Sequence, residues 1–300
     1  MARIIVTGSD GQLGRSLREY REQGEVRYLN RRDLDIRDGA SLRNILKEEK
    51  PQWLINCAAY TAVDAAETSR ALAFAINGEA VRTLAQICKE TGTRLLHIST
   101  DYVFGGTGNL PHAETSVVHP EGIYAQSKRA GEVAVQDSGA GIVLRTSWLY
   151  SYFERNFFRT ILRKCLAGES LRVVADQIGT PTWAGNLAQA IWHIVEGVTP
   201  RAGLYHYSDL GACSWYDFAC YIRKLAGTNN CIEPIGSEEW KAAAPRPHFS
   251  LLDSRQSRRE LNLGAVNWME GVECCYRALL QYENGTYFER EYKSGNHRWI

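Results

Sequence analysis

Short apolar runs alternate with longer amphipathic stretches through the first half of the chain. Brief runs rich in β-branched residues predict strands buried on both faces, and apolar residues spaced three or four apart predict helices between them. The expected strands are 3–6, 26–29, 53–59, 94–99 and 142–145, and the expected helices are 39–49, 71–91, 124–137 and one that begins at Arg15. Such alternation is typical of an α/β protein with a Rossmann-like, doubly wound parallel sheet and right-handed crossovers.

The alternation ends near Ser147, where aromatic, basic and loop-rich segments take over. We therefore expect residues 1–147 to form a dinucleotide-binding domain and residues 148–300 to form mainly a smaller substrate-binding lobe. The run at 203–207 predicts a further strand that returns to the main sheet. The C-terminal substrate lobe is then discontinuous in sequence.

Composition and charge narrow the classes of protein. With 300 residues the chain can form one two-lobed enzyme or two domains. Its net charge is +1, with basic and acidic residues interspersed, which argues against a nucleic-acid or membrane-surface partner. The first residues belong to the first strand and no apolar run approaches the length of a membrane span, so we expect a cytoplasmic protein.

Eight cysteines occur without any Cys-x-x-Cys spacing. This pattern predicts reduced core residues rather than a disulfide framework or a zinc site. Those that fall within apolar helical patterns are Cys88, Cys165, Cys220, Cys274 and Cys275. In a reducing compartment the glycosylation sequon at 284–286 is expected to be an ordinary turn.

A glycine-rich turn follows the first expected strand. Gly8, Gly11 and Gly14 are each three residues apart, which differs from the better-known Gly-x-Gly-x-x-Gly fingerprint. Glycines permit a tight turn, and the N–H groups at the start of the next helix can receive a pyrophosphate. An ordinary surface turn is the alternative, but the position directly after the first strand favours a nucleotide site.

Tyr124 and Lys128 are four residues apart and share one face of an expected helix. An ammonium beside the phenol would lower the pKa of Tyr124, which makes this residue a candidate acid or base. Thr100, at the end of the strand expected at 94–99, could hold a carbonyl or alcohol oxygen. The alternative is a buried tyrosine with a lysine that extends to the surface.

Six motifs follow one another along nearly the whole chain. They are Thr7-Gly8-x-x-Gly11-x-x-Gly14, 56–67 (NCAAYTAVDAAE), 99–104 (STDYVF), 145–150 (RTSWLY), 176–182 (DQIGTPT) and Arg246-Pro247. With these motifs the chain resembles the dTDP-4-dehydrorhamnose reductase family, in the extended branch of the short-chain dehydrogenase/reductases. Two positions differ from the family pattern: Gly105 replaces an Asp, and Ala125 replaces a Gly.

The resemblance implies a reaction in which a reduced nicotinamide cofactor delivers hydride to the C4 carbonyl of a nucleotide-linked 4-keto sugar. It implies that Tyr124 protonates the developing alkoxide, that Lys128 binds the nicotinamide ribose and lowers the tyrosine pKa, and that Thr100 bonds the same oxygen. Cofactor contacts are implied at Gly8, Gly11, Gln12, Leu13, Gly14, Arg31, Asp35, Ile36, Ala59, Tyr60, Thr61 and Ile98, and sugar contacts at Thr100, Asp101 and Trp148. Two alternatives stay open: Trp148 as core, and Asp35 as the start of a turn.

The choice of cofactor depends on the end of the second strand. An acidic residue there would bind the ribose of NAD, whereas an arginine suits the 2′-phosphate of NADP. Asn30-Arg31-Arg32 occupies this place and favours NADPH, while Asp33 keeps NADH open. A pair of solvated arginines is the alternative. The family also includes members with Mg²⁺ at a homodimer contact, although no carboxylate cluster in this sequence can be assigned to the metal.

The predicted function is reduction of a nucleotide-linked 4-keto-6-deoxy sugar, with dTDP-4-dehydrorhamnose giving dTDP-L-rhamnose for cell-surface polysaccharide synthesis. Related 4,6-dehydratases carry Thr-Asp-Glu, and Tyr102 replaces the glutamate here. A C4 epimerase keeps the same Tyr and Lys and stays open as an alternative. So does a cofactor-binding subunit without catalysis, like the regulatory subunit of methionine adenosyltransferase.

Overall fold

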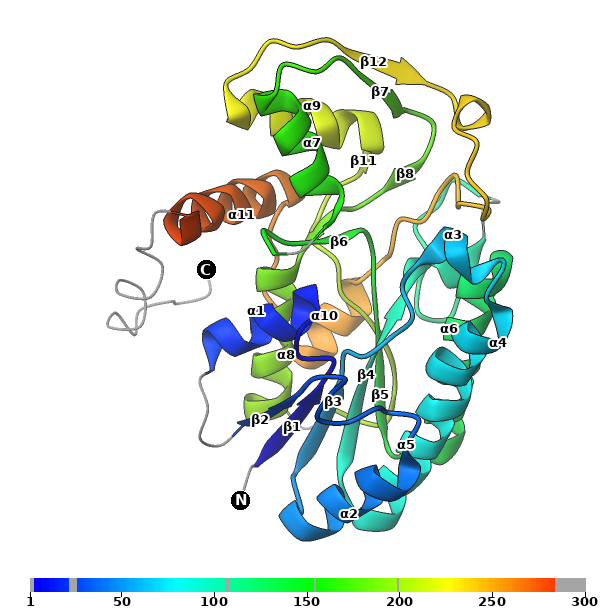
Figure 1. The fold of residues 1–300 in the computed structure, drawn as a ribbon. Coiled ribbons are helices and arrows are strands. Elements are labelled where there is room, and N and C mark those ends of the chain that lie inside the picture. The colour runs from blue at the N-terminus through cyan, green and yellow to red at the C-terminus, as the bar shows by residue number, and fades with distance from the viewer. Residues whose placement is uncertain (1–2, 22–25, 106–107, 154, 199, 284–300) are drawn as a thin grey trace.

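The computed structural model describes residues 3–21, 26–105, 108–153, 155–198 and 200–283. A six-stranded parallel sheet with the order β10-β5-β4-β3-β1-β2 crosses the larger lobe (Figure 1). Its strands are β1 (Ile4–Thr7), β2 (Val26–Leu29), β3 (Trp53–Asn56), β4 (Arg94–Thr100), β5 (Gly141–Thr146) and β10 (Gly203–His206). The predicted α/β fold with a Rossmann-like parallel sheet is confirmed.

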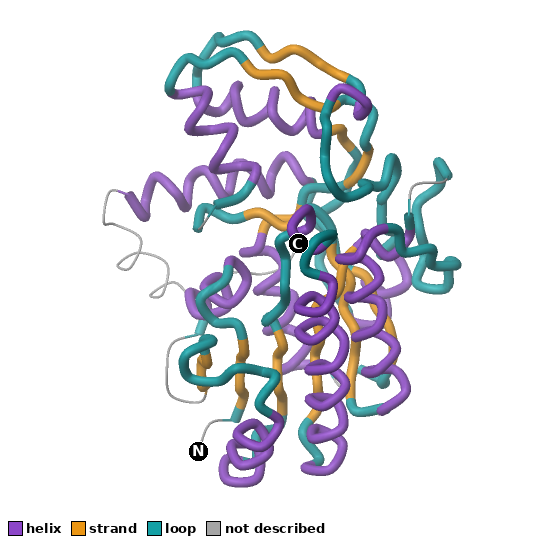
Figure 2. Tube along the Cα trace, turned by 45° about the vertical axis from the view of Figure 1, so that its right-hand side comes forward, coloured by secondary structure: helices purple, strands orange, loops and turns teal. Residues whose placement is uncertain are grey.

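Helices cover both faces of the sheet, as Figures 1 and 2 show. On one face Ile4 and Val6 pack in a core with α1 (Gln12–Tyr20) and α8 (Ala184–Gly197). On the other face Ile5 packs in a core with α2 (Gly39–Glu49), α5 (Ala80–Thr91) and α6 (Gly122–Ser138). Successive strand residues point to opposite faces, so a strand covered on both sides needs a continuous apolar run.

Two expected boundaries differ from the structure. The helix expected from Arg15 begins at Gln12, so Gly14 lies inside its first turns, where a Cβ would come within 2.5 Å of the Gly8 carbonyl oxygen. The third strand ends at Asn56 because the Asn56 side chain accepts hydrogen bonds from the Thr7 hydroxyl (2.7 Å) and from the Ala58 N–H (3.3 Å). These bonds turn the chain out of the sheet.

The helix expected at 71–91 is divided into three parts. They are α4 (Arg70–Phe74), a π-helical turn (Ala75–Glu79) and α5. The π-helical turn directs Asn77 inward, and this side chain is 1% exposed. Single π turns inside helices are frequent at functional sites.

A second lobe has its own aromatic core. It is built from α7 (Phe157–Leu166), α9 (Trp215–Ala226), α11 (Trp268–Glu283) and the parallel pair β7 (Leu171–Val174) and β12 (Ile232–Ile235). Between these segments the chain returns to the larger lobe, where α8 packs and β10 pairs with β5. The domain limits at 147 and 148 stay a prediction.

The remaining α-helices and strands are short. They are α3 (Val63–Ala66), α10 (Arg255–Leu261), the pair β6 (Leu149–Tyr150) and β9 (Thr182–Trp183), and the pair β8 (Ile178–Gly179) and β11 (Cys213–Ser214). All eight cysteines are free thiols; four of them are buried, Cys88, Cys165, Cys213 and Cys275, whereas Cys231 is exposed. The sequon at 284–286 lies outside the described residues. Within the described part of the chain, the helices are too short or too polar to cross a membrane.

Candidate active site

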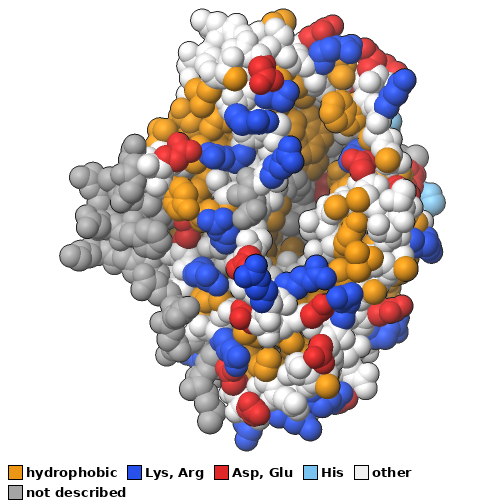
Figure 3. All heavy atoms as spheres, in the orientation of Figure 1, with side chains coloured by type: hydrophobic (Ala, Val, Ile, Leu, Met, Phe, Trp, Pro, Cys, Tyr) orange, Lys and Arg blue, Asp and Glu red, His pale blue; other side chains and the backbone are white. Residues whose placement is uncertain are grey.

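A cavity of about 880 Å³ lies above the carboxyl ends of β1, β3, β4 and β5, where the two lobes face each other. Figure 3 shows the hollow on this side of the molecule, with basic side chains along its margin. The strand order reverses between β1 and β3, and this switch point is where open α/β sheets bind their ligands. The fold therefore places a cavity at the position expected for a cofactor.

Nearly all of the predicted site residues line this one cavity. They are Gly8, Gly11, Gln12, Leu13, Gly14, Arg31, Asp35, Ile36, Ala59, Thr61, Ile98, Thr100, Asp101, Tyr124, Lys128 and Trp148. Tyr60 is the exception, although its neighbours on both sides line the cavity. Its backbone N–H donates to Asn77 Oδ1 at 2.8 Å, and its carbonyl accepts from Asn77 Nδ2 at 3.0 Å. Sequence reasoning missed Asn77, whose only signal is a polar residue on an otherwise apolar helical face.

The glycine turn, residues 8–14, brings backbone to the floor of the cavity. Gly8 has a φ of +69°, and a Cβ there would lie 2.6 Å from the Ala58 nitrogen. Gly11 precedes α1 and makes no side-chain capping bond, so the first N–H groups of α1 are open to a ligand. A helix N-terminus with this geometry suits an anion, which fits the pyrophosphate of a dinucleotide.

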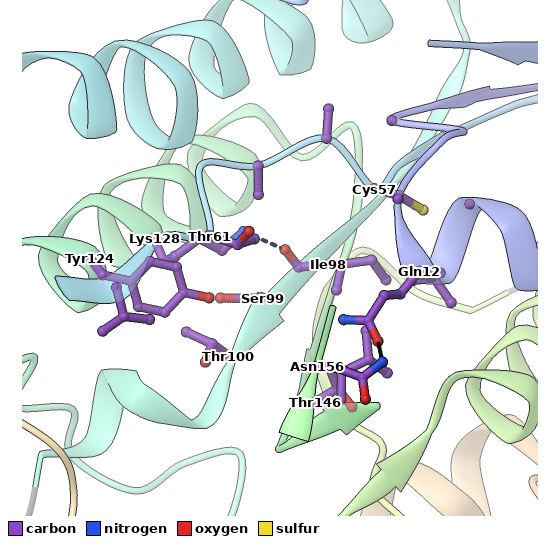
Figure 4. Close-up of a pocket in the computed structure, with 18 of the residues that line it drawn as sticks. Gln12, Cys57, Thr61, Ile98, Ser99, Thr100, Tyr124, Lys128, Thr146 and Asn156 are labelled. Carbon is purple, nitrogen blue, oxygen red and sulfur yellow. Dashed lines mark hydrogen bonds between the residues drawn. The ribbon is translucent and has the colours of Figure 1, made fainter. Parts of the chain in front are cut away.

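Thr100, Tyr124 and Lys128 meet at the end of β4 (Figure 4). The Lys128 ammonium donates a hydrogen bond to the Ile98 carbonyl at 2.6 Å, and the Thr100 hydroxyl donates to Asp101 Oδ1 at 3.1 Å. Tyr124 projects from α6 into the same space and contacts the ring of Tyr102 edge-on, at 5.7 Å between centroids. The predicted trio therefore shares one site.

The expectation that Lys128 lowers the pKa of Tyr124 is wrong. Burial raises the pKa of this phenol to about 12, a hydrogen bond with Thr100 opposes the rise, and the ammonium is directed at the Ile98 carbonyl instead. Tyr124 is therefore protonated at neutral pH. That is the form a general acid requires.

Burial also shifts the pKa values of the two charged groups beside the phenol, Lys128 and Asp101. It lowers the pKa of Lys128 to about 8, against the opposing effect of the Glu132 carboxylate. It raises the pKa of Asp101 to about 7, against hydrogen bonds from Ser250 and Thr100. Ser250 lies between β12 and α10 in sequence, and no motif pointed to it.

The end of β2 presents arginines and carboxylates at the edge of the cavity. Arg31 lines the cavity with 74% of its side chain exposed, and its Nε lies 4.0 Å from Asp35. Asp35 is held by Arg37, which donates from Nε at 2.9 Å and from Nη2 at 2.5 Å and lowers the Asp35 pKa to about 2. Asp33 accepts from the Asn30 N–H at 2.9 Å, and Arg32 is not among the lining residues.

The second lobe contributes an aromatic wall, which consists of Trp148, Phe157, Trp215 and Phe218. Trp148 stacks on Trp215 with 3.6 Å between centroids and 4° between planes. Its φ of 43° is costly for a bulky residue, of order 1–3 kcal/mol. Packing holds it there, since a Cβ on Gly179 would come within 2.5 Å of its indole. One face of Trp148 is thus covered by Trp215.

Gln12 connects the glycine turn to the second lobe. Its Oε1 accepts from Asn156 Nδ2 at 2.8 Å and from the Ser151 hydroxyl at 3.0 Å. Figure 4 shows the bond between Gln12 and Asn156 at the edge of the cavity. The two lobes therefore share a polar contact beside the glycine turn. The Mg²⁺ implied by the resemblance has no evident site, because no group of three His, Cys, Asp or Glu side chains among the described residues could hold a metal.

Comparison with known proteins places this site in a family. The family model described as "RmlD substrate binding domain" matches residues 2–281. The chain belongs to the dTDP-4-dehydrorhamnose reductase family. A protein of Burkholderia thailandensis named dTDP-4-dehydrorhamnose reductase is 37% identical, over 93% of this chain and 99% of its own length.

Two further relatives bear on the substrate and on the cofactor. A dTDP-4-keto-6-deoxy-D-glucose reductase of Streptomyces niveus is 38% identical, over 92% of this chain and 97% of its own length. The crystal structure of a dTDP-4-dehydrorhamnose reductase from Bacillus anthracis in complex with NADP superposes with a TM-score of 0.87. It is 37% identical and covers 92% of this chain and 99% of that chain.

Proposed function

We propose that the protein is an NADPH-dependent reductase that converts dTDP-4-dehydrorhamnose to dTDP-L-rhamnose, a precursor of cell-surface polysaccharide. The observation that carries the proposal is the meeting of Thr100, Tyr124 and Lys128 in one cavity with a glycine turn that fits a dinucleotide. Membership of the family supports it, because relatives across nearly the whole chain are named for this reaction.

The bound cofactor supplies the hydride to C4 of the sugar. Tyr124, protonated at neutral pH, gives its proton to the oxygen that becomes the C4 hydroxyl. The Thr100 hydroxyl holds the same oxygen, and the Lys128 ammonium stabilises negative charge that develops beside the phenol. A positioned general acid of this kind contributes about 10²- to 10⁴-fold in rate.

NADPH is favoured over NADH by the end of β2. The Asp35 carboxylate is already engaged by Arg37 through both oxygens, and one Asp33 oxygen accepts a backbone N–H. Arg31, in contrast, is largely exposed where it lines the cavity. A guanidinium in this place suits the 2′-phosphate of NADPH, and the relative from Bacillus anthracis was crystallised with NADP.

The sugar is expected to lie between the catalytic trio and the aromatic wall. The part of the Trp148 indole that lines the cavity can contact the apolar side of a deoxysugar, and Asp101 can bond a hydroxyl. Relatives are named for two different 4-keto-6-deoxy sugars. The choice of dTDP-4-dehydrorhamnose is therefore the most specific part of the proposal.

The decisive experiment mixes the protein with dTDP-4-dehydrorhamnose and NADPH. Loss of nicotinamide absorbance, matched one to one by dTDP-L-rhamnose, is the expected result. A C4 epimerase would convert the sugar without net oxidation, and a binding subunit would do neither. Tyr124→Phe is the matched control. The same reaction with dTDP-4-keto-6-deoxy-D-glucose measures the preference between sugars.

We further propose that the enzyme acts in the cytoplasm, a location that suits its eight free thiols. The family resemblance also allows a homodimer. Sedimentation of the purified protein would test this oligomeric state.

A further inference from the structure

Behind the catalytic trio, α6, β4 and β5 meet around a buried ion pair. The Glu132 side chain is 0% exposed and that of Arg145 is 1% exposed. Arg145 Nε donates to Glu132 Oε1 and Nη2 donates to Oε2, each at 2.7 Å. This two-point geometry is the strongest that an arginine and a carboxylate can form.

Glu132 accepts two more hydrogen bonds. Ser99 Oγ donates to Oε1 at 2.7 Å, and Arg129 Nη1 donates to Oε2 at 2.8 Å. Ser99 immediately precedes Thr100 on β4, and Glu132 lies one helical turn after Lys128 on α6. One carboxylate therefore joins the strand that carries Thr100 to the helix that carries Lys128.

We propose that Glu132 is a positioning residue for the reduction: its carboxylate fixes Thr100 relative to Lys128 and supplies the negative charge that keeps the Lys128 ammonium protonated. The kinetic part of this proposal rests on the proposed function. Stability alone is a weak reason for such a pair, because well-packed apolar residues often replace a buried ion pair without loss.

The groups that face Lys128 come from three elements. Glu132 lies on its own helix, His97 lies on β4, and Cys57 follows β3. Burial lowers the pKa of His97 well below its usual range and raises that of the Cys57 thiol to about 12, so both are neutral at pH 7. Burial by itself would raise the Glu132 pKa, but hydrogen bonds from Arg145, Ser99 and Arg129 outweigh it and hold the pKa below its usual value.

The direction of the pH effect follows. Burial lowers the Lys128 pKa to about 8, and Glu132 is the larger of the two influences that oppose the fall. Without the carboxylate, Lys128 loses its proton at lower pH. Because the ammonium form is the active one, the alkaline limb of the kcat/KM profile must move toward neutral pH.

The first test is Glu132→Gln, with kcat/KM measured against pH. We expect the alkaline midpoint to fall by about one pH unit and kcat at neutral pH to fall about tenfold. Asp137→Asn is the matched control, since Asp137 is an exposed carboxylate on the same helix. Its profile should overlay that of the parent.

A second variant distinguishes the proposed effect of Glu132 on the position of Thr100 and the charge of Lys128 from an effect on folding. Glu132→Gln leaves Arg145 buried without its carboxylate, so we combine it with Arg145→Met. The double variant should regain most of the parent's unfolding temperature while its alkaline midpoint stays below that of the parent. A folded variant with the parent's profile would overturn the proposal. Failure of both variants to fold would do so too, because the pair would then be needed for the fold itself.

A third measurement keeps this inference separate from the proposed function. NADPH affinity is titrated against pH in the parent and in the double variant, and the alkaline loss of affinity should begin at lower pH in the variant. If the parent binds NADPH but reduces no sugar, the proposed function fails while the titration still decides the role of Glu132.

Discussion

The glycine turn and the aromatic wall both line one cavity, but they are made in different ways. The glycine turn is a continuous stretch of chain, and its shape depends on the backbone: Gly8 and Gly14 leave no space for a side chain. The aromatic wall brings together Trp148 and Trp215, which lie far apart in sequence and meet only through folding. The glycine turn suits a pyrophosphate, a group that many enzymes bind. The aromatic wall can differ between enzymes that act on different sugars.

The comparison implies that changes in the glycine turn and changes in the aromatic wall have separable effects on cofactor binding and on sugar binding. Backbone N–H groups recognise a pyrophosphate whatever sugar lies opposite. Aromatic faces select the substrate by shape and apolar contact. Tyr124, the proposed general acid, belongs to neither the glycine turn nor the aromatic wall, so its removal should affect turnover and leave both binding functions in place.

The largest effect is expected for Tyr124→Phe. Loss of the general acid should lower kcat by about 10²-fold or more, while NADPH affinity and sugar affinity stay close to those of the parent. Stopped-flow turnover measures the first quantity, and fluorescence titration measures the other two. Turnover near that of the parent would show that the proton comes from elsewhere.

Gly8→Ala tests the glycine turn. The positive φ and the close approach of the Ala58 nitrogen should cost about 1–3 kcal/mol, seen as a loss of NADPH affinity of about 10- to 100-fold. Gly11→Ala is the matched control, because its Cβ would lie 3.4 Å from the Gly8 oxygen with an ordinary φ of −73°. Equal losses in the two variants would contradict a role for backbone shape.

The same contrast explains what the sequence could reveal. The fold and the glycine turn were predictable because apolar runs and glycine spacing are local signals. Trp215 was missed because its partner Trp148 lies in another segment, and only the packed structure shows that the two rings stack. The direction of the Tyr124 pKa was wrong because a helical spacing shows which residues share a face, but not that Lys128 bonds a carbonyl or how much water is excluded.

Trp148→Ala tests the aromatic wall. Removal of the indole should raise the sugar KM about tenfold, equivalent to about 1.4 kcal/mol, while NADPH titrations overlay those of the parent. Trp240→Ala is the control, because Trp240 is 57% exposed and is not among the residues that line the cavity. Joint loss of cofactor binding and sugar binding, or unfolding, would assign Trp148 to the core of the second lobe.

The smallest effect is expected at the end of β2, where two neighbouring arginines differ in position. Arg31 lines the cavity, whereas Arg32 does not. Because Arg31 is largely exposed, its contact with a 2′-phosphate is screened, and Arg31→Ala should weaken NADPH binding only about fivefold, or about 1 kcal/mol. NADH affinity should not change, since NADH lacks that phosphate, and the loss for NADPH should shrink at high salt. Arg32→Ala should leave both affinities unchanged. Equal losses for the two cofactors in Arg31→Ala would mean that the arginine supports the shape of the loop rather than recognising a phosphate.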